Sequence, residues 1–177
     1  MKPHPGFCNS ALPREAALGA FRLTPLSPAY VDEDLKAVTG SERVLCGLFG
    51  DDWPKGLTRE ENAVDLAWHE REFTAKRSFA WIIRDQAGTY LGCAYLYPDL
   101  GARGRAEVTT WMCDTPGRVE RLSCFNAAFS DWLAPLLPEG YALRRSSTLQ
   151  SGNDTSMPSR ASSEHLRGLK KISRYPF

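Results

Sequence analysis

Alternating hydrophobic and polar positions between residues 79 and 112 predict three strands of one sheet. In the segment FAWIIRD, residues 79, 81 and 83 point to one side of a strand, and residues 80, 82 and 84 point to the other. Gly88 supplies the backbone freedom that a tight turn needs before a second strand, YLGCAYLYP. A polar, glycine-containing loop over residues 99–105 then leads to a third strand over residues 107–112.

A helical spacing of apolar residues follows the third strand. The spacing is close to 3.6 residues and predicts an amphipathic helix that buries one face. The residues expected on that face are Val119, Leu122, Phe125, Phe129, Trp132, Leu133 and Leu136.

Two further helices and two further strands are predicted outside this region. Thr58 and Glu61 have the spacing of a capping box, at the start of a helix that runs to about Lys76. Residues 30–38 predict a short helix with three acidic residues near its N-terminal end. Residues 21–26 alternate and then meet prolines, and residues 141–143 are apolar, so both predict strands. The order of elements indicates an α/β (α+β) fold with a mixed, mostly antiparallel sheet flanked by helices.

The two ends of the chain differ from its middle. Residues 1–19 are rich in proline and small residues, so we expect a flexible arm with order beginning near Phe21 and a single domain over residues 20–177. Residues 144–163 are rich in Ser, Arg, Asn and Thr, which is typical of disorder. We nevertheless expect a helix capped by Ser159 that ends at Gly168, and a closing strand beyond it beside residues 141–143.

Composition and charge limit the partners and the cellular location that we expect for this protein. The 177 residues suit one globular domain, and a net charge of +1 gives no general attraction to nucleic acid or to an anionic membrane, so we expect neither as a partner. The five cysteines have no metal-ligand spacing, and we interpret them as reduced thiols. The first 20 residues lack the apolar run of a signal peptide, and the expected location is the cytoplasm.

Motifs in three places resemble the GNAT N-acetyltransferase superfamily. The sequence RLTPL at residues 22–26 resembles the opening strand of its branch that acetylates ribosomal proteins and small molecules. The passage from the strand at residues 107–112 through DTPGRVE into a helix resembles the acyl-CoA-binding core, and residues 159–169 resemble the closing motif. The resemblance implies transfer of an acetyl group from acetyl-CoA to an amine of a small molecule or of a protein N-terminus.

The resemblance also implies where acetyl-CoA binds. Backbone N–H groups near Trp111, Met112 and Cys113 would hold the thioester, and those of the loop around Pro116, Gly117, Arg118 and Val119 would surround the pyrophosphate. The family has several glycines in this loop, whereas this chain has only Gly117. The carboxylate of Glu120 would also repel a phosphate. Cofactor binding is therefore weakened or differently arranged, and an inactive GNAT-like binding or interaction module is the alternative function.

Three residues are candidates on the acceptor side. Glu107 lies on the strand that borders the acceptor site in the family, where a carboxylate can take a proton from an ammonium group, or it is a strand-end charge in solvent. Trp53 and Tyr95 would form a wall with the acidic turn at residues 51–52, or Trp53 packs in the core. Ser163 stands where relatives have a tyrosine that protonates the leaving thiolate, and we expect it to be structural.

Other reactive side chains have simpler explanations. His69 and Glu72 are expected on a solvated helix face, and no metal site is expected because Phe73 occupies the i+4 position from His69. Cys113 has no histidine nearby in the sequence and reads as a small buried thiol rather than a nucleophile. The excess of basic residues after Tyr141 reads as a solvated tail, and a homodimer is left open.

Overall fold

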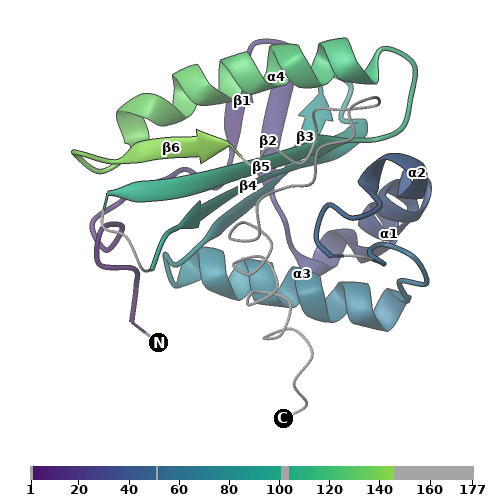
Figure 1. Cartoon of the computed structure of the whole chain (residues 1–177), viewed down its shortest axis with the longest axis horizontal. Helices are drawn as coiled ribbons and strands as arrows, with labels where there is room; N and C mark the ends of the chain where they lie inside the picture. Colours follow the sequence, from purple (N-terminus) through teal and green to yellow (C-terminus); the bar gives the residue numbers. More distant parts are fainter. Residues whose placement is uncertain (1, 51, 101–103, 146–177) are drawn as a thin grey trace.

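A twisted sheet of six strands forms the centre of the molecule (Figure 1). The structure, a computed structural model, describes residues 2–50, 52–100 and 104–145. The strands lie in the order in which they occur in the sequence, and every neighbouring pair is antiparallel except the last, β5 with β6. Their bounds are β1 Ala16–Leu18, β2 Phe21–Pro25, β3 Phe79–Asp85, β4 Tyr90–Pro98, β5 Arg105–Met112 and β6 Ala142–Arg145.

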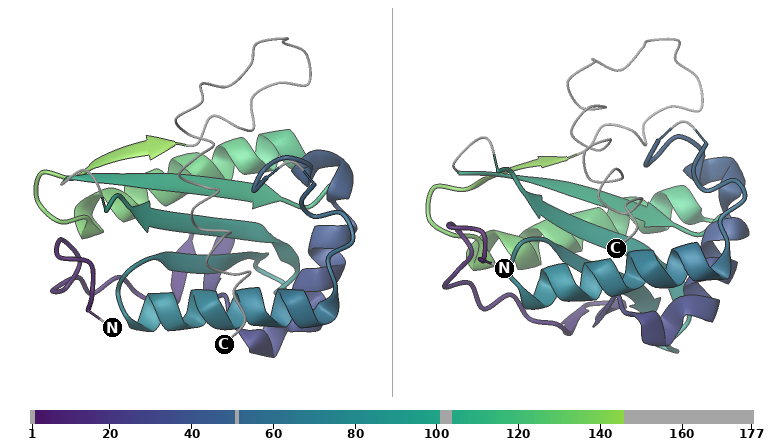
Figure 2. Two further views of the ribbon diagram at one scale, coloured as in Figure 1. Left: turned by 60° about the horizontal axis from the view of Figure 1, so that its bottom comes forward. Right: turned by 90° about the horizontal axis from the view of Figure 1, so that it is seen from below.

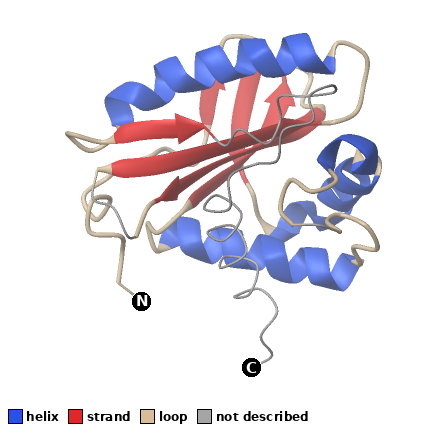
Figure 3. Cartoon of the chain, in the orientation of Figure 1, coloured by secondary structure: helices blue, strands red, loops and turns tan. Residues whose placement is uncertain are grey.

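Helices cover both faces of this sheet (Figures 1 and 3). The long helix α4 lies on one face, and α1, α2 and α3 lie on the other. Their bounds are α1 Val31–Thr39, α2 Glu42–Leu45, α3 Arg59–Thr74 and α4 Arg118–Leu133, with short 3-10 turns at Pro28–Tyr30 and Ala134–Leu136. The α/β prediction with a mostly antiparallel mixed sheet is confirmed.

Each face of the sheet has its own hydrophobic core, as the alternation in β3 predicts. Phe79, Trp81 and Ile83 pack into the core beneath α4, and Ala80 and Ile82 pack into the core beneath α1 and α3. Since successive side chains of a strand point to opposite faces, this one strand contributes to both cores. The predicted capping box is also present, because the Thr58 hydroxyl accepts from the Glu61 N–H and the Glu61 carboxylate accepts from the Thr58 N–H.

The parallel pairing of β5 with β6 is short, and the C-terminal part of β5 is not paired with β6. The register runs from Arg105 opposite Ala142 to Val108 opposite Arg145. On its other edge β5 is paired with β4 from Ala106 to Met112. Among the residues that the structure describes, the last four residues of β5 therefore have a strand partner on the β4 side alone. Figure 2 shows β6 lying along only part of the longer β5.

The N-terminal segment differs from the prediction of a flexible arm over residues 1–19. Ala16–Leu18 forms strand β1, and Phe7 is fully buried with its ring 5.4 Å from that of Phe79 and 5.1 Å from that of Tyr141. The prediction that order begins near Phe21 is therefore wrong. The segment lacks periodicity because an irregular loop, and not a helix or strand, brings Phe7 into the core.

One position of the predicted helix face is also wrong. Leu122, Phe125, Phe129 and Leu133 are buried against the sheet as expected, but Val119 is 67% exposed. The contact of α4 with the sheet begins only at Leu122, so the first turn extends the periodic pattern without a surface to cover it. The predicted closing helix and strand, with Ser163, lie outside the described residues. Within the described part of the chain, no helix is long and apolar enough to cross a membrane.

Candidate functional site

The passage from β5 into α4 forms a compact loop at one end of the sheet. The N–H of Cys113 donates to the Leu91 carbonyl at 2.7 Å, and the N–H of Thr115 donates to the Cys113 carbonyl at 2.9 Å. Gly117 then adopts a left-handed conformation, with φ of 71°, as the residue that caps α4. Only glycine adopts this conformation without strain, and a Cβ at this position would meet no atom within 4 Å. The space beside the Gly117 Cα is therefore open.

Several backbone N–H groups remain available at the start of α4. The N–H of Arg118 donates to Thr115 and that of Arg121 donates to Gly117. Within the described residues, the N–H groups of Gly117, Val119 and Glu120 have no backbone acceptor. The free N–H groups and the dipole of a helix N-terminus together favour an anion. The predicted pyrophosphate position therefore has donors of the required type.

Two arginines of α4 fold back onto this loop. Arg118 Nε donates to the Met112 carbonyl at 3.0 Å. Arg121 Nη2 donates to the Thr115 hydroxyl at 2.6 Å and to the Pro116 carbonyl at 2.7 Å. These bonds hold two guanidinium groups against the passage from β5 into α4, and their positive charge opposes the negative charge of Glu120. Arg121 was not predicted from the sequence, although its position one turn after Arg118 is a signal that could have identified it.

Glu107 lies on the face of β5 that is turned toward α3. It is directly opposite Tyr97 on β4, with Thr109 opposite Tyr95 and Trp111 opposite Cys93 along the same face. Glu107 is 8% exposed, and its Oε2 accepts from Arg144 Nη2 at 2.8 Å. It is a buried carboxylate in an ion pair with β6, so the alternative of a strand-end charge in solvent is wrong.

Trp53 and Tyr95 belong to one aromatic cluster, although 41 positions of sequence separate them. Phe49 joins them, with ring centroids 4.9 Å from Trp53 and 5.4 Å from Tyr95. Tyr95 stacks on Tyr97 at 5.8 Å and accepts from the Trp111 indole N–H at 3.3 Å. Burial raises the pKa of both tyrosine hydroxyls well above the usual range, so they stay protonated at neutral pH. Phe49 was not predicted.

His69 and Glu72 are buried, which corrects the prediction of a solvated helix face. His69 is 6% exposed, its ring lies 5.2 Å from that of Tyr95, and its Nε2 is 3.5 Å from Asp65 Oδ2. Glu72 is 4% exposed and forms a bidentate ion pair with Arg77. His69 is thus buried against Tyr95 of β4, whereas Glu72 is buried in its pair with Arg77. In the described ranges, no three His, Cys, Asp or Glu side chains are grouped so as to hold a metal ion.

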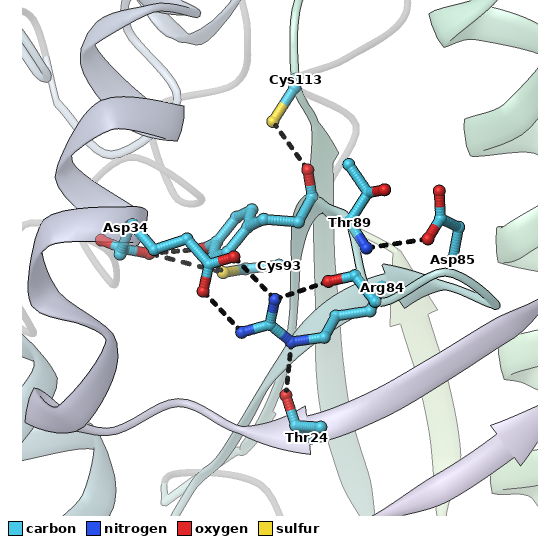
Figure 4. Close-up of polar contacts among 10 residues, drawn as sticks. Thr24, Asp34, Arg84, Asp85, Thr89, Cys93 and Cys113 are labelled. Carbon is cyan, nitrogen blue, oxygen red and sulfur yellow. Dashed lines mark hydrogen bonds and ion pairs between the residues drawn. The ribbon is translucent and has the colours of Figure 1, made fainter.

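A buried polar cluster connects α1 with the sheet beside this site (Figure 4). Asp34 accepts hydrogen bonds from the Tyr90 hydroxyl and from Asn62 Nδ2, the latter at 2.9 Å. Burial raises the pKa of the Asp34 carboxyl, against the effect of these two bonds. The Cys93 thiol lies 2.9 Å from the Tyr90 hydroxyl, and the Cys113 thiol donates to the Tyr90 carbonyl at 3.8 Å. Burial raises the pKa of Cys113 as well, which disfavours the thiolate that a nucleophile needs.

Arg84 closes this cluster toward solvent (Figure 4). Its guanidinium lies over the rings of Tyr30 and Tyr90, at 5.1 and 5.7 Å, and forms an ion pair with Glu33 at 2.6 Å. The cluster thereby attaches α1 to β3, β4 and α3.

Two surface hollows lie away from the loop between β5 and α4. One, of about 630 Å³, is bounded by Arg14 and by α3, and another, of about 320 Å³, lies between residues 6–11 and 135–138. Neither includes a residue of the loop between β5 and α4 or of the acceptor face. We therefore place the candidate site by its hydrogen-bond donors and charges.

Comparison with solved structures identifies the fold. A ribosomal-protein-serine acetyltransferase assigned in Vibrio cholerae superimposes with a TM-score of 0.57 at 12% identity, over 88% of this chain and 80% of the other. The ribosomal L7/L12 α-N-protein acetyltransferase RimL, in complex with coenzyme A, gives 0.58 at 15% identity, over 68% and 67%. The microcin C7 self-immunity acetyltransferase MccE, in complex with acetyl-CoA and AMP, gives 0.53 at 11% identity, over 73% and 72%.

Sequence comparison adds nothing further, since no protein-family model and no curated protein sequence matches the chain. The similarity to the solved acetyltransferases is thus one of three-dimensional structure. The chain has the GNAT N-acetyltransferase fold.

Proposed function

We propose that this protein is an N-acetyltransferase that moves an acetyl group from acetyl-CoA to a primary amine of a small molecule or of a protein N-terminus. One observation supports the proposal above all. The β5–β6 pairing ends at Val108, so the last four residues of β5 are not paired with β6, and the chain then continues to the free N–H groups at the start of α4. Solved relatives of the same fold bind coenzyme A or acetyl-CoA, and one acetylates a protein α-amino group.

The residues at this end of the sheet fit the cofactor. Trp111, Met112 and Cys113 would lie along the pantetheine, and the N–H groups of Gly117, Val119 and Glu120 would bind the pyrophosphate. The open space at Gly117 lets an anion approach the backbone closely. Arg118 and Arg121 supply positive charge where other glycines are missing. When bound, acetyl-CoA supplies an activated acetyl group as a thioester.

The acceptor face would receive the amine as its ammonium form and remove one proton. In the proposed step the Glu107 carboxylate takes that proton, directly or through water. The neutral nitrogen would then form a bond to the thioester carbonyl carbon as the carbon–sulfur bond breaks. That nitrogen would lose a second proton to the departing thiolate, directly or through water, which leaves the amide and the free thiol. Trp53 and Tyr95 would orient the amine, since aromatic faces attract cations. Arg144 competes for the same carboxylate, so an arriving ammonium has to displace or share this ion pair.

An inactive GNAT-like binding or interaction module is the second candidate function. The single glycine of the loop and the carboxylate of Glu120 favour it, because both weaken phosphate binding. We also propose that the protein acts in the cytoplasm, without a metal and without a nucleic-acid or membrane partner. A homodimer remains a prediction.

Calorimetric titration with acetyl-CoA and with CoA tests the proposal. We expect saturable binding of both in the micromolar range, and release of free thiol when a panel of primary amines and peptides with free N-termini is added. Peptides of the same sequence with an acetylated N-terminus are the matched control and should release none. Binding without thiol release from any acceptor would favour the inactive module, and absence of binding would refute the acetyltransferase.

A further inference from the structure

Helix α2 makes direct contact with the loop that precedes α4. Arg43 Nε donates to Asp114 Oδ2 at 2.9 Å, and Arg43 Nη2 donates to Asp114 Oδ1 at 2.7 Å. The backbone N–H of Asp114 donates to the hydroxyl of Ser41, which is 2% exposed, at 3.0 Å. Asp114 is thereby held through its main chain and through both carboxylate oxygens, by two residues that lie 71 and 73 positions away in sequence.

The position of Asp114 makes its charge important. It lies three residues before Gly117, at the entrance to the predicted pyrophosphate site, and Glu120 lies three residues after Gly117. Two carboxylates this close to a bound phosphate would repel it. The Arg43 guanidinium binds the Asp114 carboxylate in the bidentate geometry that most fully neutralises it. With Arg118 and Arg121, three arginines then oppose two carboxylates around the loop.

We propose that Arg43 is a positioning residue for cofactor binding, which masks the charge of Asp114 and fixes the loop between β5 and α4 for the pyrophosphate. The inference rests on the proposed function, because it assumes that coenzyme A binds at this loop. It assigns a cofactor role to α2, which lies on the face of the sheet opposite α4. Arg43 itself is 78% exposed at its side chain, so its removal leaves no cavity in the core.

Calorimetric titration of CoA into purified full-length variants at low ionic strength tests this role. Arg43→Ala should weaken CoA binding at least about fivefold, because the exposed Asp114 carboxylate then repels the phosphates. Arg43→Ala combined with Asp114→Asn should return the dissociation constant to within about twofold of wild type, since the repelling charge is gone. Raising the salt concentration should shrink the difference between Arg43→Ala and wild type.

Arg59→Ala is the matched control. Arg59 forms the same kind of exposed bidentate pair with Asp32, at 2.6 and 3.1 Å, but this pair joins α3 to α1 and includes no residue of the loop between β5 and α4. Its CoA affinity should equal that of wild type. Arg43→Gln keeps most of the side-chain stem and replaces Arg43→Ala if the alanine variant melts early.

The outcomes separate the two proposals. Unchanged CoA binding in Arg43→Ala, with normal binding in wild type, overturns the role of Arg43 alone. Equal weakening in Arg43→Ala and in the double variant overturns the masking of Asp114. Absence of CoA binding in wild type refutes the proposed function, and this inference fails with it.

Discussion

The Glu107 carboxylate and the Arg144 guanidinium are joined at 2.8 Å across the parallel strands β5 and β6. The side chain of Glu107 is 10% exposed and that of Arg144 is 60% exposed, so the pair faces solvent only through the arginine. The candidate proton acceptor is therefore buried, charged and partnered. Its role in turnover and its role in holding β6 have to be separated by experiment.

We expect Glu107→Gln to lower turnover by roughly 100-fold, because glutamine keeps the shape of the side chain but cannot accept the ammonium proton. Affinity for acetyl-CoA should change little. The measurement is steady-state thiol release with an acceptor identified in the amine screen, at saturating amine and neutral pH.

The control for this substitution is Arg144→Gln, which breaks the same ion pair and keeps the carboxylate. It should retain turnover if Glu107 is the base. Equal losses in the two variants would assign Glu107 a structural role, and equal turnover of Glu107→Gln and wild type would remove it from the mechanism.

Gly117→Glu should weaken binding of acetyl-CoA at least about tenfold, or about 1.4 kcal/mol. The substitution adds a negative charge beside the free N–H groups and forces a non-glycine residue into a left-handed conformation. Calorimetry provides the dissociation constant. Gly117→Ala has the same backbone strain without the charge and should weaken binding less. An unchanged dissociation constant for Gly117→Glu would exclude this loop from the site.

Gly92→Ala should destabilise the protein by about 2–4 kcal/mol. Gly92 has a φ of 155°, and a Cβ there would lie 2.0 Å from the Trp111 carbonyl oxygen. Strands β4 and β5 would have to separate next to the residues proposed to hold the thioester. Chemical denaturation measures the loss, and Gly88→Ala, whose Cβ would meet no atom within 4 Å, isolates the backbone strain of a positive φ from the steric clash. Equal stability of Gly92→Ala and wild type would contradict this close approach.

Asp34→Asn should change the pH dependence of stability. Burial raises the pKa of Asp34 in the folded state, so the folded protein holds this proton more tightly than the unfolded chain does. The stability that comes from the proton is present at low pH and is lost as pH rises through the folded-state pKa. Unfolding free energies measured at pH 4.5 and pH 7 should therefore favour wild type over Asp34→Asn more at the lower pH. The opposite trend would show that the carboxylate is stabilised as an anion.

Deletion of residues 1–18 should destabilise the protein, contrary to the expectation for a loose arm. It removes β1 and the fully buried Phe7, and Phe7→Ala alone should cost about 3–4 kcal/mol. Thermal melting of the truncated protein and of Phe7→Ala provides the test. Deletion of residues 1–3 leaves His4 and Phe7 in place and should have little effect. A truncation of residues 1–18 with an unshifted midpoint would show that the aromatic contact contributes nothing.

Local patterns in the sequence predict the helices and strands and the faces that they bury. Three such patterns are the alternation in β3, the capping box at Thr58 and the spacing of Leu122, Phe125 and Phe129. Each depends on residues close together in the sequence, so a short window of sequence contains the whole pattern. The loop at Gly117 was predicted because it lies between a predicted strand and a predicted helix.

Contacts between residues far apart in the sequence depend on how the whole chain packs. Two ion pairs join segments 37 and 71 positions apart: Glu107 with Arg144, and Arg43 with Asp114. The ring contact of Phe49 with Tyr95 likewise joins distant segments. The burial of Phe7 and the exposure of Val119 likewise depend on where the sheet ends, which no local repeat records. A periodic pattern specifies the side of an element that is apolar, whereas the packing of the whole chain decides whether a surface exists to cover it.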